Sequence, residues 1–387
     1  MKILHTSDWH LGHQLYGYDR KEEQLDMLNQ ITDIVATEKP DAFLLCGDVF
    51  HVSQPSASVQ KMFVDAILSL RKAHPDMKMI VTAGNHDSGV RHEIFSTPWS
   101  LMGVETIGTL HQEKIEEHII DVNGKGYVIA LPYVNERYLQ GDFFQSVLER
   151  VASINKKGIP VIMMAHTTVR GADFTEHDRS DSTVVGGIEG IEVSQLGEGY
   201  DYLALGHIHH EQFVHTGRHN VRYCGTPLAV SFDETYEHSV SIVETNSHGD
   251  APKVRKIKIE NKRPLINLPL EGFTDWNHAK ALLKDFPDDK EAYIRLNVEV
   301  ENYLPNGAVD EARQIVSTKK CRFCLINDHR RRDQTGELKS MTVSEFKELD
   351  PIDLVQRYIE QKGGTFTQEI ASMFREAVNQ LNQGDET

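Results

Sequence analysis

Residues 79–87 read Met-Ile-Val-Thr-Ala-Gly-Asn-His-Asp, an apolar run that ends in small and polar residues. A short apolar run with β-branched residues, bounded by turn-forming residues, is typical of a buried strand. We therefore predict a strand at Met79–Ala83 and a loop at Gly84–Asp87. A loop of this polarity is costly to bury unless its side chains have partners. The segment thus predicts a functional loop at the end of a strand.

The same arrangement occurs four more times in the first 210 residues, behind apolar runs at 2–6, 42–46, 161–165 and 202–205. The four motifs are Ser7-Asp8-Trp9-His10, Cys46-Gly47-Asp48-Val49-Phe50-His51, Met164-Ala165-His166 and Gly206-His207-Ile208-His209. Side chains two positions apart on an extended chain point the same way, so Asp8 and His10 can reach one ligand together. A single motif of this kind is compatible with an ordinary turn. Five of them behind apolar strands indicate one polar site.

Helical periodicity connects the first three strands. Arg20–Thr37 and Ser56–Lys72 each carry apolar residues at helical spacing, which predicts strand–helix–strand units and a largely parallel sheet. The chain then becomes strand-rich at 221–224, 240–244 and 254–259. The fold class is therefore mixed α/β. Loops at the carboxyl ends of parallel strands are where such sheets bind ligands, so we expect the five motifs to converge.

Two further segments follow the first 263 residues. Residues 264–335 predict a smaller α/β domain, with a helix near Asp275–Asp285 and a strand at Tyr293–Val300. Residues 341–382 predict a helix pair, because Asp350 can cap a helix that starts at Pro351, and a second helix starts near Thr367. Two short amphipathic helices cannot bury both apolar faces in each other. They either dock on their own core or bind a helix of a partner.

The chain of 387 residues has 39% hydrophobic and 26% charged residues, as in ordinary globular proteins. No apolar run is long enough for a membrane span, and the start of the chain does not read as a signal peptide, so we expect no membrane association. Four scattered cysteines, Cys46, Cys224, Cys321 and Cys324, form no disulfide framework. They indicate a cytoplasmic protein. We favour ordinary reduced thiols over a structural zinc site at Cys321 and Cys324, because a second pair of metal ligands at the required spacing is missing.

A net charge of −17 argues mildly against nucleic acid as a ligand. Bound divalent cations would offset part of that charge at a site, and the basic residues are unevenly distributed. Seven Lys or Arg lie between Arg313 and Arg332 against one acid, and six lie between Lys253 and Arg263 against one. Either run can be a nucleic-acid contact or a solvated face.

The donor types at the five motifs define the class of metal. They offer carboxylate, amide oxygen and imidazole without thiolate, a set that suits Mn²⁺, Fe or Zn²⁺ in five- or six-coordinate sites.

The series Asp-x-His, Gly-Asp, Gly-Asn-His-Asp, His and Gly-His-x-His resembles the calcineurin-like metallophosphoesterase superfamily. Within it, residues 3–12, 47–51, 202–209 and 223–234 resemble the bacterial SbcD nucleases, the nuclease subunits of SbcCD complexes. The resemblance is dense over residues 1–235 and continues as domain order. It implies a two-sheet β-sandwich flanked by helices, with the 264–335 segment as a DNA-binding cap and the 341–382 helices as the site for an ATPase partner.

The resemblance also implies how the donors divide between two metal ions. One ion would be bound by Asp8, His10, Asp48 and His209, and the other by Asp48, Asn85, His166 and His207. Asp48 would bridge the pair. The expected ions are Mn²⁺, with Mg²⁺ as the alternative.

Three further residues take catalytic roles by the same resemblance. His86 would face the scissile phosphate and help protonate the leaving oxygen, and Asp87 would orient its imidazole. His51 would position the DNA strand, although an ordinary surface histidine is the alternative. The continuation His210-Glu211 departs from the basic residue and proline that are usual in these nucleases, which affects local substrate contacts and leaves the metal ligands unchanged.

The leading hypothesis is a metal-dependent DNA nuclease. It would act as a double-strand exonuclease and as an endonuclease on single strands and hairpins, in DNA repair, recombination and replication. Its expected partners are an SbcC-type ATPase with a coiled coil and a second copy of the chain, paired through helices near Ser56–Lys72 and Val90–Leu101 within a heterotetramer. The alternatives are a phosphatase or small-molecule phosphodiesterase on the same core, and a non-catalytic scaffold.

Overall fold

The computed structural model describes residues 1–133, 142–173, 190–214 and 219–330, together with Thr367 and Ile370. The chain divides into two compact units, residues 1–330 and 331–387. The predicted helix pair at 341–382 lies outside the described residues, apart from Thr367 and Ile370.

A six-stranded sheet carries the first three motifs. Its order is β14–β13–β1–β4–β5–β6, and β1, β4, β5 and β6 run parallel. The bounds are β1 Lys2–Thr6, β4 Ala42–Cys46, β5 Lys78–Thr82, β6 Val104–Ile107, β13 Ser239–Glu244 and β14 Lys253–Lys258. The strands predicted ahead of the motifs are confirmed. The two antiparallel strands β13 and β14 close one edge.

A second six-stranded sheet carries the other two motifs. Its order is β11–β12–β10–β9–β8–β7, with β8, β9, β10 and β12 parallel. The bounds are β7 Ile119–Asp121, β8 Tyr127–Ala130, β9 Val161–His166, β10 Tyr202–Gly206, β11 Gln212–Phe213 and β12 Val221–Tyr223. This strand-rich second half confirms that the core is mixed α/β.

The two sheets pack face to face. One buried cluster joins Ile3, Leu44 and Ile80 of the first sheet to Ile162 and Ala204 of the second. Such interdigitation of two inner faces is the packing of a β-sandwich. The expected two-sheet sandwich is therefore confirmed.

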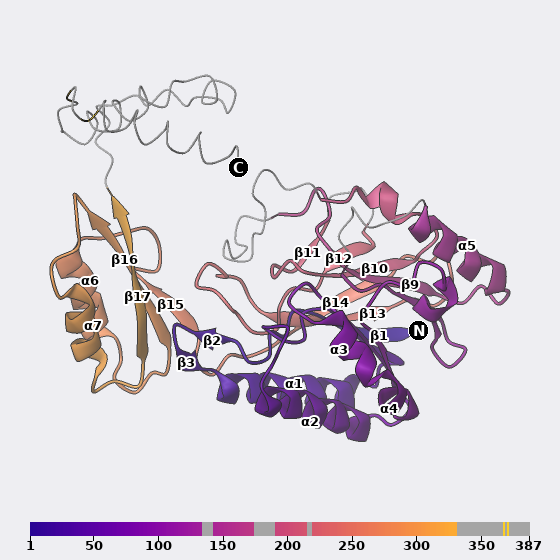
Figure 1. The fold of residues 1–387 in the computed structure, drawn as a ribbon. Coiled ribbons are helices and arrows are strands. Elements are labelled where there is room, and N and C mark those ends of the chain that lie inside the picture. Colours follow the sequence, from indigo (N-terminus) through magenta and orange to yellow (C-terminus); the bar gives the residue numbers. More distant parts are fainter. Residues whose placement is uncertain (134–141, 174–189, 215–218, 331–366, 368–369, 371–387) are drawn as a thin grey trace, which may run out of the picture. The chain divides into compact units, whose positions relative to one another are not determined.

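Helices cover the outer faces of both sheets (Figure 1). The first sheet packs against α1 and α2, and the second against α5. The helices are α1 Lys21–Glu38, α2 Ala57–Ala73, α3 Gly89–Ile94, α4 Ser96–Leu101 and α5 Phe143–Ile154. The short elements are β2 Gln14–Leu15, β3 Tyr18–Asp19, η1 Ile115–His118 and η3 Val193–Leu196. Among the helices of the described residues, none is both long and apolar enough to cross a membrane.

Residues 265–330 form a smaller α/β arrangement with its own buried core. A parallel sheet of order β15–β16–β17 packs against α6 and α7. The bounds are β15 Leu265–Leu268, α6 Trp276–Asp285, β16 Tyr293–Val300, α7 Ala308–Val316 and β17 Arg322–Arg330. Helix α6 begins where predicted because the Asp275 carboxylate accepts from the N–H groups of Asn277 and His278. That this segment is a separate DNA-binding domain stays a prediction.

Candidate metal centre

The five motifs follow the carboxyl ends of β1, β4, β5, β9 and β10, and backbone hydrogen bonds join their loops. Asp8 N donates to Gly47 O at 3.0 Å, and His10 N donates to Asp48 O at 3.0 Å. The N–H of His207 donates across the two sheets to the Asp8 carboxylate at 3.1 Å. Loops from both sheets therefore meet at one place, as the sequence predicts.

Four of the predicted metal ligands occupy the left-handed region of backbone conformation. The φ angles are 53° at Asp8, 43° at His10, 49° at Asp48 and 99° at His207. Residues with a side chain seldom adopt such angles, and each instance costs on the order of 1–3 kcal/mol. Backbone strain is thus concentrated at the donor positions, as is usual for functional sites.

Two glycines allow the loops to approach each other. A Cβ atom on Gly84 would lie 2.0 Å from Asp48 Oδ1. A Cβ atom on Gly47 would lie 2.2 Å from His166 Nδ1, and Gly47 has a φ of 82°. Any larger residue at either position would displace a predicted ligand.

The first group of donors contains Asp8, His10 and His209, whose potential ligand atoms all lie within 4.8 Å of one another. His10 Nε2 and His209 Nε2 are 3.1 Å apart. All three residues are at most 1% exposed. This group corresponds to the first predicted ligand set.

The second group contains Asp48, His166 and His207. The amide oxygen of Asn85 joins it, at 3.0 Å from both His166 Nε2 and His207 Nδ1. Asp48 Oδ2 lies 3.3 Å from His166 Nε2 and 3.9 Å from His10 Nε2. One carboxylate oxygen therefore faces both groups, where a bridging ligand would lie.

The outer nitrogens of two of the imidazoles are held by partners. His209 Nδ1 lies 3.0 Å from Glu234 Oε1, and His166 Nδ1 lies 2.8 Å from the carbonyl oxygen of Cys46. Metal-bound histidines usually donate their second N–H in this way, which orients the ring and fixes the tautomer. Both Nε2 atoms are thereby directed toward the clustered donors. Glu234 is not among the predicted site residues, although it ends one of the stretches that carry the family resemblance.

The electrostatics of the cluster fit bound cations. Burial raises the pKa of Asp8, although the charges of His166 and His209 oppose this. Burial also disfavours a charged His166 ring, but the Asp48 carboxylate outweighs it and raises the pKa of His166 to about 9. Burying two carboxylates among imidazoles is costly unless positive charge compensates them. Divalent ions that accept nitrogen and oxygen donors supply such charge.

His86 and His51 lie together beside the first donor group. His86 Nδ1 donates to the backbone oxygen of His51 at 3.0 Å, and the two rings are stacked with centroids 5.7 Å apart. The His10 ring lies 5.0 Å from that of His86. The backbone N–H of His86 donates to Asp48 Oδ1 at 2.9 Å. The structure thus brings both predicted non-ligand histidines to the donor cluster.

Asp87 holds the loop backbones. Its carboxylate accepts from the N–H groups of Val49, Phe50 and Gly84 at 2.9–3.0 Å, and His92 Nε2 lies 3.6 Å away. Burial raises the pKa of Asp87, but His92 and the backbone donors more than reverse this, so the pKa is lowered. The predicted orientation of the His86 ring by Asp87 stays a prediction. His92, which no sequence motif singles out, contacts this carboxylate.

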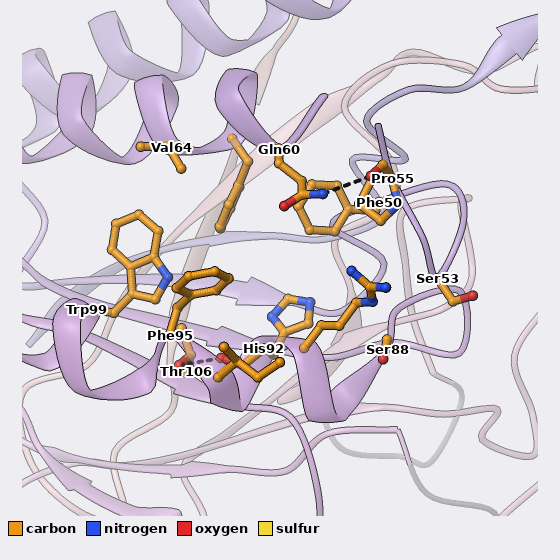
Figure 2. A pocket seen from close by; sticks show the side chains of 13 residues that line it. Phe50, Ser53, Pro55, Gln60, Val64, Ser88, His92, Phe95, Trp99 and Thr106 are labelled. Atoms are coloured by element: carbon orange, nitrogen blue, oxygen red, sulfur yellow. Dashed lines mark hydrogen bonds between the residues drawn. The ribbon is translucent and has the colours of Figure 1, made fainter. Parts of the chain in front are cut away.

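An apolar pocket of about 290 Å³ lies on the other side of His92, between α2 and the α3–α4 segment (Figure 2). Phe95 and Trp99 line it opposite Val64, and Thr106 Oγ1 donates to the backbone oxygen of His92 at 3.3 Å. Several apolar side chains of these helices are exposed, namely Val64 38%, Leu68 46%, Val90 65%, Ile94 65%, Phe95 53% and Leu101 86%.

The two basic runs differ in their partners. On β14, Arg255 pairs with Glu38 at 2.8 Å, Lys256 with Glu211 at 3.0 Å, and Lys258 with Glu260 at 3.1 Å. The charge of the 253–263 run is thus largely matched by acids, which favours a solvated face. In the later run, Lys319 is nearly buried against three acceptors, whereas Arg330 is exposed.

All four cysteines are free, and none belongs to a group of potential metal ligands in the part of the chain that the structure describes. This agrees with ordinary thiols.

Comparison with known proteins gives a consistent result. The family model described as calcineurin-like phosphoesterase matches residues 1–211. A protein of Bacillus subtilis, named as the SbcD component of the SbcCD nuclease, is 30% identical over 338 residues, covering 81% of this chain and 83% of the relative. Proteins of the same name from Rhodobacter capsulatus and Escherichia coli are 29% and 26% identical, covering 70% and 79% of this chain and 72% and 79% of those relatives.

Proposed function

The chain belongs to the calcineurin-like phosphoesterases and, within them, to the family of SbcD nucleases, and from this premise we propose that it is a two-metal DNA nuclease. It hydrolyses phosphodiesters, as a double-strand exonuclease and as an endonuclease on single strands and hairpins. The observation that carries the two-metal proposal is the position of Asp48, whose Oδ2 faces His166 of one donor group and His10 of the other.

The proposed ligands are Asp8, His10, Asp48 and His209 for one ion, and Asp48, Asn85, His166 and His207 for the other. Imidazole nitrogens favour Mn²⁺ over Mg²⁺, which prefers oxygen ligands and water. Two divalent ions about 3.5–4 Å apart lower the pKa of a bound water and neutralise charge that develops on the phosphate. Glu234 and the Cys46 carbonyl hold the ligand rings in place.

His86 is proposed to act on the substrate directly. Its Nδ1–H is engaged by the His51 carbonyl, so Nε2 is the ring atom that we expect to meet the phosphate. A protonated ring with this tether can donate from Nε2 to a non-bridging oxygen or to the leaving oxygen. His51, stacked on His86, is proposed to position the strand. Asp87 acts on both through the loop backbones.

The proposed partners follow from the relatives, which are named as one component of a two-part complex. We propose that the helix pair at 341–382 binds the coiled coil of an SbcC-type ATPase, and that the segment at 264–335 caps the site and contacts DNA. The four free cysteines support a cytoplasmic location.

A second copy of the chain is proposed to cover α2, α3 and α4. Exposed apolar side chains cluster there around the pocket of Figure 2. Apolar patches of this kind mark interaction surfaces in proteins that would otherwise expose them to water.

The experiment that tests the proposed function compares two substrates. The protein, loaded with Mn²⁺, is given an end-labelled hairpin DNA and, separately, a nitrophenyl phosphate ester. Cleavage of the hairpin with chelator-sensitive kinetics supports the nuclease. Cleavage of the ester alone would establish the phosphatase alternative, and two bound ions without cleavage of either substrate would establish the scaffold.

A further inference from the structure

The turn at 231–234 connects the smaller α/β arrangement to the candidate metal centre. Its last residue, Glu234, contacts His209, and its middle residues, Phe232 and Asp233, contact Arg295 on β16. We propose that Arg295 is a positioning residue for the metal centre, which holds this turn so that Glu234 orients His209. The inference rests on the proposed assignment of His209 as a metal ligand.

Arg295 grips the turn at three points. Its Nη1 donates to Asp233 Oδ1 at 2.7 Å, its Nη2 donates to the backbone oxygen of Phe232 at 3.3 Å, and its guanidinium lies 5.4 Å from the centre of the Phe232 ring. Its Nε donates to Asn267 Oδ1 at 2.8 Å, and Asn267 in turn donates to the same Phe232 oxygen at 3.3 Å. The guanidinium is thus fixed in one orientation and binds both backbone and side chain of the turn.

Burial separates this contact from an ordinary surface ion pair. The Arg295 side chain is 13% exposed, whereas that of Asp233 is 49% exposed. Phe232 is 3% exposed and packs with Leu15 and Tyr293. Exposed ion pairs contribute little, but a planar guanidinium that also binds a carbonyl and a ring adds geometric restraint. The position of the turn therefore depends on β16 as well as on the sandwich.

The other end of the turn reaches the metal centre within one residue. The Glu234 side chain is fully buried, its Oε1 lies 3.0 Å from His209 Nδ1, and it accepts from Val230 N at 3.4 Å. His209 is 1% exposed. Because Glu234 directly follows Asp233, a shift of the held backbone would move the carboxylate away from the ring nitrogen.

The expected consequence is a change in metal affinity. Loss of a hydrogen-bond partner of a metal-bound histidine typically weakens metal binding 10- to 100-fold. Arg295 acts through Glu234 and does not touch the ring, so its removal should weaken binding by a smaller factor, about 3- to 10-fold. The effect should be confined to the ion bound by His209.

The test measures Mn²⁺ binding to the full chain by calorimetry, with electron paramagnetic resonance of free Mn²⁺ as a second readout. The variants are Arg295→Met, Asp233→Asn, which retains the size of the side chain, and Glu234→Gln as the reference for direct loss. Lys280→Met is the matched control, because the ion pair of Lys280 with Glu311 stays within the smaller arrangement. Melting curves in chelator verify that every variant is folded.

We expect Arg295→Met and Asp233→Asn to weaken the binding of one of the two ions, Glu234→Gln to weaken it further, and Lys280→Met to leave it unchanged. Hydrolysis of bis(p-nitrophenyl) phosphate at limiting Mn²⁺ should fall in the same order and recover at saturating Mn²⁺. Affinities equal to the wild type in both Arg295→Met and Asp233→Asn would overturn the inference.

The ester separates this role from a DNA contact. If Arg295 only bound DNA, Arg295→Met would lower DNA cleavage and leave ester hydrolysis and Mn²⁺ affinity unchanged, which would also overturn the inference. Failure of the wild type to bind two ions would instead contradict the proposed function, so the two failures are distinguishable.

Discussion

The Nδ1 atom of His86 lies 3.0 Å from the backbone carbonyl oxygen of His51, so the loop after β4 orients a ring that belongs to the loop after β5. The two loops are also joined by the N–H of His86, which donates to Asp48. His86 is therefore placed by the same segment that carries the proposed bridging ligand, without being a proposed ligand itself.

His86→Ala should bind two Mn²⁺ ions with affinities close to the wild type and lose nearly all cleavage, by a factor of about 10²–10⁴, because positioned proton donors contribute on this order. Calorimetry gives the stoichiometry, and single-turnover cleavage of hairpin DNA gives the rate. Binding of a single ion would show that His86 is a ligand.

Asp48→Ala should abolish tight binding of both ions, whereas Asp8→Ala should abolish only one, because only the Asp48 carboxylate faces both donor groups. Metal content after gel filtration is the measurement. Retention of one tightly bound ion in Asp48→Ala would contradict the bridging role.

The stability of the metal-free protein should fall as the pH drops from about 6.5 toward 3. Burial, with the charge of Arg222 adding to it, lowers the pKa of His5 to about 3. Between that value and the ordinary pKa near 6.5, the unfolded chain binds a proton that the folded chain does not, so the free energy of unfolding decreases toward acid by up to about 1.4 kcal/mol per pH unit.

His5→Phe removes this group and should reduce that slope by up to one proton, while lowering stability at neutral pH because the Tyr202 hydroxyl loses its 3.0 Å partner. Urea denaturation in chelator at several pH values measures both effects. An unchanged slope would show that another group accounts for the acid sensitivity.

Arg330→Gln should weaken duplex DNA binding and reduce the slope of log affinity against log salt by about 1, if this exposed arginine contacts a phosphate. Lys258→Gln, in which the lost charge already pairs with Glu260, is the matched control and should leave the slope unchanged. Fluorescence anisotropy over a salt series, with catalysis blocked by chelator, measures both. Equal slopes in Arg330→Gln and the wild type would remove Arg330 from the DNA surface.

Leu101→Arg should convert a dimer into a monomer, because a side chain that is 86% exposed beside the apolar pocket would become charged at the proposed contact between the two copies. Leu270→Arg changes an equally apolar side chain, 76% exposed, in the smaller α/β arrangement, and should have no such effect. Light scattering after gel filtration gives the mass. A wild-type chain that is monomeric at micromolar concentration would refute the pairing.

The strands and loops of the site are predictable because their signals are local. An apolar run ahead of a polar motif marks both the end of β5 and the loop that carries Asn85, and the same holds at the other four motifs. The division into two sheets cannot be read from the runs themselves, since strand pairing joins residues far apart in sequence. It follows from the resemblance to a known family.

Residues that act through long-range contacts escape prediction from sequence. Glu234 lies 25 positions after His209 in a turn without a motif, and His92 lies in a short helix where one histidine carries no signal. The 253–263 run shows the same limit for charge. Sequence gives the six cations, but the acids that pair with them, such as Glu38 and Glu211, come from distant segments.

The left-handed backbone at Asp8, His10, Asp48 and His207 sets a trade-off between stability and activity. Glycine adopts such angles without steric cost, so Gly in place of Asp48 would relieve strain while removing the bridging carboxylate. Selection for a more stable chain alone would therefore favour the loss of these donors. For the same reason, transplanting the donors onto another parallel sheet would fail unless the turns that hold them were transplanted too.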